Sequence, residues 1–159
     1  MSAPEKENLK DSLKVALAFL SYRARSVSEV VSKLKSKGFS SDETAATIDY
    51  LLFSGYLDDN AFARALTESR IKNKHWGARR IAADLGAKGI AEDVVRSAVS
   101  GISVDDERLV AGAAFDKWLK KTGLKPPLKG KDFEKAYRHL VSRGFFGEAI
   151  SAVLKKPRE

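Results

Sequence analysis

The sequence of 159 residues contains no cysteine, so it can form neither a disulfide nor a thiolate metal site. It has only two histidines, His75 and His139, and neither belongs to a His-x-x-Glu-His motif or to another paired metal-ligand motif. A glycine-rich phosphate loop of the Walker type is also lacking. We therefore predict that the protein is not an enzyme and that it has no catalytic residues, no metal site and no cofactor.

Long hydrophobic runs are lacking too. No apolar stretch approaches the roughly 18–20 residues that a membrane-spanning helix needs. The first residues, MSAPEKENLKD, are polar with charges of both signs, which is typical of neither a signal peptide nor a transit peptide. Together with the absence of cysteine, these features predict a cytoplasmic protein without a membrane partner.

Strand signals are scarce, because no run of six residues alternates between apolar and polar types and β-branched residues are few. Apolar residues recur instead at helical spacing, as Leu13, Leu17 and Leu20 do. Hydrophobic residues make up 43% of the chain and charged residues 31%, which is typical of a folded, soluble protein. We therefore predict an all-α fold.

One motif occurs three times, as LKSKGF (34–39), LGAKGI (85–90) and LVSRGF (140–145). The step from Gly38 to Gly89 is 51 residues, and the step from Gly89 to Gly144 is 55. A period of this size indicates stacked supersecondary units. Because glycine adopts the left-handed conformation with little strain, we expect each of these glycines to end a helix.

Capping patterns mark where the helices begin. Ser-x-x-Glu occurs at Ser26 and Ser40, and the acidic pairs at 58–59 and 105–106 stand before helical segments, where we interpret them as caps. Two prolines interrupt the last third. We predict a flexible segment at 1–9 and three-helix repeats at 10–57, 58–103 and 104–159, with a Pro/Gly/Lys-rich loop at 122–131. Since a unit of about 45 residues buries little core alone, the repeats should stack into an elongated, curved molecule.

The chain is basic, with 29 Lys and Arg against 21 Asp and Glu, a net charge of +8. The excess is +1 over residues 1–57, +2 over 58–103 and +5 over 104–159. Such a balance favours a polyanion or an acidic protein surface as partner. The alternative is that the charge serves solubility only.

A basic residue precedes each repeated glycine: Lys37, Lys88 and Arg143. A cation near a helix C-terminus interacts favourably with the helix dipole, by about 0.3–1 kcal/mol, and this alone explains the pattern. The competing hypothesis is that equivalent positions in stacked repeats project from one face. They would then form a row of positive charge along a curved surface, able to follow a polyanionic or filamentous partner.

The middle of the chain adds basic residues around an aromatic one. SRIKNKHWGARR places five cations close to Trp76, an arrangement that suits phosphate contacts with stacking. We favour burial of Trp76 at a junction between two helices, and Arg80 could form an i,i+4 pair with Asp84. The predicted binding surface consists of Lys35, Lys37, Arg70, Lys72, Lys74, Arg79, Arg80, Lys88, Arg138 and Arg143.

Three strings over about residues 12–100 carry a family resemblance: ALAFLSYRARSVSEVVSKLKSKGF, IDYLLFSGYLDDNAFARALTESR and GARRIAADLGAKGI. In this order and at these intervals they resemble the RecX family of regulatory proteins, chiefly through GYLDD-x-x-FA followed by Arg70, Gly77 and the Lys-Gly-Ile at 88–90. The last third is a looser match, since TGLKPPLKGKD departs from a compact third repeat, although YRHLVSRGF restores the usual ending.

The resemblance implies a bacterial cytoplasmic protein that binds the RecA recombinase on DNA. Members of the family are three-helix-repeat proteins that lodge in the groove of the RecA filament and dampen its recombinase and coprotease activities. The implied processes are homologous recombination, DNA repair and the SOS response to DNA damage. We expect a monomer that contacts the RecA filament, and single- or double-stranded DNA directly or through RecA.

Two alternatives stay open at this point. The chain could be a non-specific DNA-binding or architectural helical protein that acts without RecA. It could also be an interaction scaffold whose basic surface meets an acidic protein. A steep fall of affinity for bare DNA with salt would favour the first of these alternatives.

Overall fold

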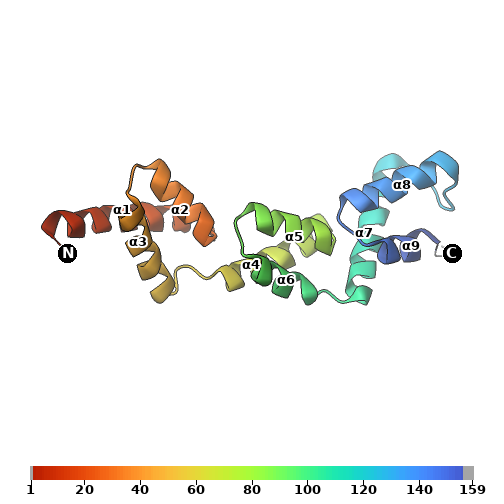
Figure 1. Cartoon of the computed structure of the whole chain (residues 1–159). Helices are drawn as coiled ribbons and strands as arrows, with labels where there is room; N and C mark the ends of the chain where they lie inside the picture. The colour runs from red at the N-terminus through yellow and green to blue at the C-terminus, as the bar shows by residue number, and fades with distance from the viewer. Residues whose placement is uncertain (1, 156–159) are drawn as a thin grey trace.

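The computed structural model describes residues 2–155, and every regular element in that range is helical. The helices follow one another as three tandem three-helix repeats in an elongated, curved molecule (Figure 1). The predicted fold class is confirmed. Within the described residues, no helix combines the length and the apolar character that crossing a bilayer requires.

Repeat 1 consists of α1 (Ala3–Tyr22), α2 (Val27–Ser36) and α3 (Ser41–Phe53). Repeat 2 consists of α4 (Asp59–Ser69), a π-helical turn η1 (Arg70–Lys74), α5 (Ala78–Ala87) and α6 (Glu92–Ser100). Repeat 3 consists of α7 (Val104–Thr122), α8 (Gly130–Ser142) and α9 (Gly147–Lys155). The two prolines lie between α7 and α8, in a segment that is shorter than the loop expected at 122–131.

The start of α1 differs from the sequence-based expectation. Residues 3–9 are part of this helix rather than a separate flexible segment before the first repeat. Ser2 and Glu5 form a reciprocal capping box, and a proline stands in the first turn, where its fixed φ angle suits a helix. The same Ser-x-x-Glu pattern that marked two later helices therefore also starts this one.

Each repeat has a hydrophobic core of its own. Leu34 and Leu51 are fully buried in repeat 1, and Ile81 and Leu85 in repeat 2. In repeat 3 the core gathers around Phe145, with the aromatic and aliphatic side chains of α7 and α9 against it. Because the three cores are separate, the angle between repeats depends on the contacts at the two junctions.

The repeated motif ends a helix in the same way three times. Gly38, Gly89 and Gly144 have φ angles of 88°, 75° and 88°, which confirms the predicted left-handed helix ends. In each copy the N–H of the apolar sixth residue donates to the carbonyl of the leucine at position one, over 3.2–3.4 Å. This is the 6→1 bond of a Schellman motif, which explains why both the leucine and the glycine recur.

Candidate functional site

The second helices of the three repeats follow one another end to end along one side of the molecule (Figure 1). At the junction of repeats 1 and 2, named joint 1–2, Ser26 Oγ at the start of α2 donates to the Lys88 carbonyl at the end of α5, over 2.6 Å. At the junction of repeats 2 and 3, named joint 2–3, the Gly77 N–H at the start of α5 donates to the Arg143 carbonyl at the end of α8, over 2.8 Å.

Two of the predicted binding residues hold joint 2–3 together. Arg80 Nη1 in repeat 2 donates to the Ser142 carbonyl over 3.2 Å. In the opposite direction, Arg143 Nη1 in repeat 3 donates to the Lys74 carbonyl over 3.1 Å. Each arginine thus binds a carbonyl near a helix end of the neighbouring repeat, where its charge is favourable.

The three cations that precede the glycines share a position but not an environment. Lys37, Lys88 and Arg143 are the C-cap residues of α2, α5 and α8. Lys37 is exposed and has no side-chain partner among the described residues. Lys88 instead forms an ion pair in which its Nζ lies 3.9 Å from Asp84 Oδ1. Since Arg143 bridges joint 2–3, the structure does not place three equivalent free cations in a row.

Trp76 is half-buried against the core of repeat 2, which agrees with the interpretation that we favoured from the sequence. The guanidinium of Arg80 lies 4.1 Å from the centre of its ring, and that of Arg70 lies 5.1 Å from it. Arg70 Nε is also 2.7 Å from Asp84 Oδ2, so this aspartate pairs with Arg70, and at longer distance with Lys88, rather than with Arg80. Trp76 therefore packs between the elements of its repeat instead of offering a free stacking face.

The remaining predicted cations are exposed. Arg79 lies over the ring of Phe146 in repeat 3, 5.0 Å from its centre, and Arg138 is 3.8 Å from Glu134. Both side chains of this ion pair are largely exposed to solvent, so the pair restrains Arg138 little. Four lysines have no side-chain partner in the part of the chain that the structure describes: Lys35, Lys37, Lys72 and Lys74.

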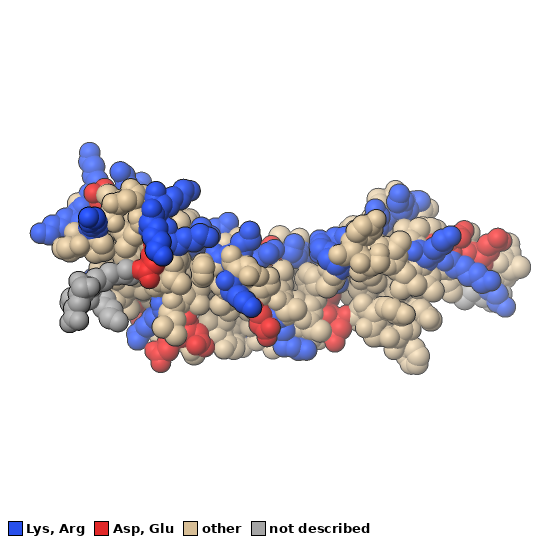
Figure 2. Space-filling view, turned by 180° about the vertical axis from the view of Figure 1, so that it is seen from behind, with Lys and Arg blue, Asp and Glu red and all other residues tan. Residues whose placement is uncertain are grey.

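Figure 2 shows how charge is distributed over one face of the molecule. Lys and Arg atoms run along its upper edge, which is hollowed over the middle and is the edge formed by α2, α5 and α8. Much of the acidic surface in this view lies along the lower edge. The second helices therefore present a basic, concave edge, which we call the basic edge.

One part of this surface was missed by the sequence reasoning. Phe19 carries Arg25 over its ring, 3.8 Å from the centre, and Lys33 at 5.2 Å. A groove of about 390 Å³ runs beside it across joint 1–2, lined by Phe19, Lys33, Lys88 and the serines of α2. The spacing of Ser28, Ser32 and Ser36, four residues apart on one helix face, was the available signal.

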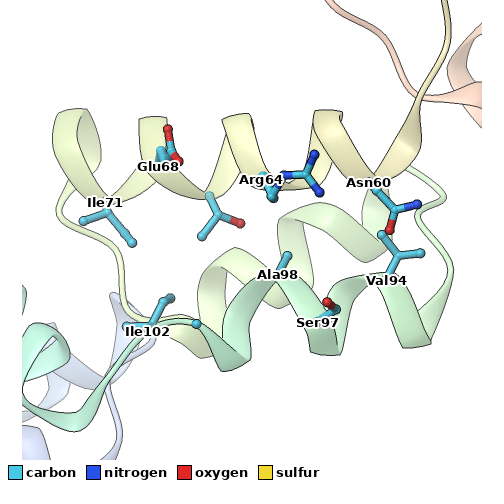
Figure 3. Close-up of a pocket in the computed structure, with 10 residues that line it drawn as sticks. Asn60, Arg64, Glu68, Ile71, Val94, Ser97, Ala98 and Ile102 are labelled. Atoms are coloured by element: carbon cyan, nitrogen blue, oxygen red, sulfur yellow. The ribbon is translucent and has the colours of Figure 1, made fainter. Parts of the chain in front are cut away.

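A second groove, of about 300 Å³, lies between α4 and α6 of the middle repeat (Figure 3). Ile71 and Ile102 line one end, and Asn60 and Val94 line the other. Its charged lining residues are Arg64 and Glu68, of opposite sign. This groove therefore lacks the single-sign charge of the basic edge.

Two titratable groups near the basic edge have shifted pKa values. Burial acts to raise the pKa of Glu29, but hydrogen bonds from Arg23 and from the Ser26 N–H, together with the charge of Lys88, lower it overall. Burial lowers the pKa of His139, and the charges of Arg143 and Lys121 lower it further. These surroundings therefore favour the charged form of Glu29 and the neutral form of His139.

Comparisons with known proteins match this architecture. The profile described as the first three-helix domain of RecX matches residues 13–51, and that of the second three-helix domain matches residues 58–99. The chain is 35% identical to the regulatory protein RecX of Chromobacterium violaceum over 144 residues, which is 90% of this chain and 89% of the relative.

Other relatives are longer. The chain is 34% identical to the regulatory protein RecX of Bacillus licheniformis over 151 residues, 94% of this chain, but it spans only 56% of that relative. The crystal structure of RecX from Lactobacillus salivarius has the same fold, with a TM-score of 0.82 at 19% identity, over 94% of this chain and 96% of the other.

Proposed function

The chain belongs to the RecX family of regulatory proteins, and on this basis we propose that it regulates the RecA recombinase by binding the RecA–DNA filament. The processes in which we propose that it acts are homologous recombination, DNA repair and the DNA-damage response, and the proposed location is the bacterial cytoplasm. In this proposal the protein inhibits or modulates the recombinase and coprotease activities of RecA as a monomer, without chemistry of its own.

The observation that carries the proposal is the basic edge. Its exposed cations come from consecutive repeats: Lys35 and Lys37 from repeat 1 and Arg79 from repeat 2, with Lys72 and Lys74 on the adjoining turn η1. A filament presents the same anionic groups again and again along its groove. An elongated protein with cations on one concave side can contact several of these groups at once, and each phosphate it neutralises releases counterions.

The proposed mechanism follows from rigidity rather than from catalysis. The curved three-repeat protein would span neighbouring RecA subunits and fix their spacing. It would thereby oppose the addition of subunits or favour their release. Arg80 and Arg143 have a second role in this account, because their hydrogen bonds across joint 2–3 hold the two repeats in place. Arg70 and Lys88 pair with Asp84 inside repeat 2.

The test compares two double charge reversals in the inhibition of RecA's DNA-dependent ATP hydrolysis. K74E/R79E reverses two exposed cations at the start of α5 and on the adjoining turn η1, and R64E/R96E reverses two exposed cations on α4 and α6. We expect the first variant to lose inhibition and the second to retain it, with equal helical circular dichroism. Full inhibition by K74E/R79E would contradict the proposal.

A second candidate function is binding of DNA without RecA, which the net charge of +8 favours. Its affinity for single-stranded DNA would fall steeply with salt, and RecA would not improve retention on the DNA. The same two double variants separate this candidate, since any loss of positive charge would then weaken binding whichever edge it came from.

A further inference from the structure

The N-terminus of α5 is completed by the following repeat. Its N-cap residue is Gly77, which has no side chain to accept a hydrogen bond from the first turn. Three successive N–H groups instead find acceptors in repeat 3: Gly77 donates to the Arg143 carbonyl, Ala78 to Glu107 Oε1 and Arg79 to the Gly144 carbonyl, over 2.8, 3.0 and 3.1 Å. Helix α5 therefore depends on repeat 3 for its cap.

Glu107 is the one side chain among these acceptors. It comes from the first turn of α7, and only 7% of its surface is exposed. A carboxylate at the positive end of a helix makes a charge-assisted hydrogen bond that is stronger than a neutral one. Glu107 thus fixes the start of α7 against the start of α5.

The same device occurs at joint 1–2. Asp59 belongs to the first turn of α4, and its Oδ1 accepts from the Val27 N–H at the start of α2, over 2.9 Å. In both joints an acidic residue from the first helix of one repeat caps the second helix of the preceding repeat. Helix α2 depends less on this contact than α5 does on Glu107, because α2 also has its own capping box of Ser26 and Glu29.

We infer that Glu107 is a positioning residue of the binding surface: it contacts no partner, but it sets the angle of repeat 3 on repeat 2 and so the curvature of the basic edge. Asp59 has the equivalent role at joint 1–2, with less dependence on it. The effect of Glu107 on the angle between repeats 2 and 3 does not depend on any partner. Only its consequence for RecA rests on the proposed function.

The test measures a distance across joint 2–3 that changes with the angle between the two repeats. Because the chain has no cysteine, spin labels at A83C in α5 and A113C in α7, both at exposed alanines, report one distance across joint 2–3. We expect a single narrow distance distribution in the parent, a broad or displaced one in Glu107→Ala, and recovery in Glu107→Gln, whose amide oxygen still accepts from Ala78. A narrow, unmoved distribution in Glu107→Ala would overturn the inference.

Matched controls isolate the cap from a change of charge. Asp105→Ala removes an acid from the same helical turn, where its side chain is 89% exposed and pairs with Arg108 at 3.6 Å, so the distance should not change. A label pair at A45C and A83C reports joint 1–2 and should be unmoved in Glu107→Ala. Broadening by Asp105→Ala as large as that by Glu107→Ala would also overturn the inference.

If Glu107→Ala loses helical circular dichroism, Glu107→Asp replaces it, because the shorter side chain keeps the charge but withdraws the oxygen from Ala78. Its distribution should broaden, and an unmoved one counts against the inference. In the RecA assay, we expect the concentration for half inhibition to rise about tenfold in Glu107→Ala, the effect of about 1.4 kcal/mol, and to recover in Glu107→Gln. Altered distances with unaltered inhibition would refute the role in binding while leaving the structural role.

Discussion

The two joints connect equivalent elements by different means. At joint 1–2 side chains make the contacts, with Ser26 Oγ on the Lys88 carbonyl and Asp59 on the Val27 N–H. Joint 2–3 also has side-chain contacts, from Arg80, Glu107 and Arg143, but there N–H groups of α5 donate directly to carbonyls at the end of α8 as well. Side chains can shift by changing rotamer, whereas backbone contacts cannot. We conclude that joint 2–3 is the more rigid of the two and tolerates substitution less.

The glycines express this difference most clearly. A Cβ added to Gly144 would lie 2.3 Å from the backbone nitrogen of Arg80. A Cβ added to Gly77 would lie 2.4 Å from the carbonyl oxygen of Gly144. A Cβ on Gly89 would instead meet the side chain of Ser28, at 2.3 Å, and one on Gly38 would meet no atom within 4 Å. One sequence motif thus serves three environments: a free end, a side-chain joint and a backbone joint.

The largest expected effect comes from Gly144→Ala compared with Gly38→Ala. Both glycines have a φ angle of 88°, so the left-handed conformation costs each alanine about 1–2 kcal/mol. Only Gly144→Ala also forces the backbones of joint 2–3 apart, and we expect it to lose about 4 kcal/mol or more. Urea unfolding of the two variants measures the difference, and equal losses would show that joint 2–3 is not tightly packed.

A smaller effect is expected at joint 1–2. Gly89→Ala should cost about 2–3 kcal/mol, from its φ angle of 75° and from overpacking against Ser28. Made in a Ser28→Gly parent, the same change should cost only the left-handed strain of about 1–2 kcal/mol. A double-mutant cycle by urea unfolding gives the coupling. Zero coupling would mean that joint 1–2 does not depend on this contact.

Next in size is the comparison of two equivalent cations. Arg143→Ala removes the hydrogen bond to the Lys74 carbonyl and should cost about 0.5–1.5 kcal/mol. Lys37→Ala removes an exposed side chain without a described partner and should cost about 0.5 kcal/mol or less. In the RecA assay we expect the order to differ, because Lys37 belongs to the free cations of the basic edge. Equal stability losses would argue against a bridging role for Arg143.

The smallest effect concerns pH and repeat 3. Because the folded pKa of His139 lies below its ordinary value of 6.5, protons bind the unfolded chain more readily than the folded one. Its contribution to stability is therefore complete above pH 6.5 and declines as the pH falls below that value. His139→Phe keeps a ring against Trp118 and should flatten the fall of the urea midpoint between pH about 7.5 and about 5.5. If the urea midpoint of His139→Phe falls as steeply as that of the parent, other titratable groups cause the fall.

Local features of the fold could be predicted from the sequence. The Schellman ends of α2, α5 and α8 need only a glycine and flanking apolar residues, which the motif shows directly. The acidic pairs were harder. Asp58 caps α4 as expected, but Ser103 caps α7, and Asp59 and Glu107 cap helices of the preceding repeat. An acid before a helix looks the same in sequence whether its hydrogen bond is made within its repeat or across a joint.

The proposed binding surface could be predicted from the sequence only as a set of basic residues. Basic residues at and near the second helices could be recognised from the repeat, but not the use that each one has. Arg80 and Arg143 bind carbonyls of neighbouring repeats, and Arg70 pairs with Asp84, because stacking brings those groups within reach. Such contacts join residues 14 to 69 positions apart and leave no local pattern. The four free lysines, in contrast, are exposed and have no side-chain partner within residues 2–155.

Co-sedimentation of the protein with RecA–DNA filaments, compared with DNA alone, tests the central claim most directly. We predict that the parent and R64E/R96E pellet with the filament at a salt concentration at which bare DNA no longer retains them, and that K74E/R79E stays in the supernatant. Retention that is equal with and without RecA, or a K74E/R79E variant that pellets as the parent does, would contradict the account.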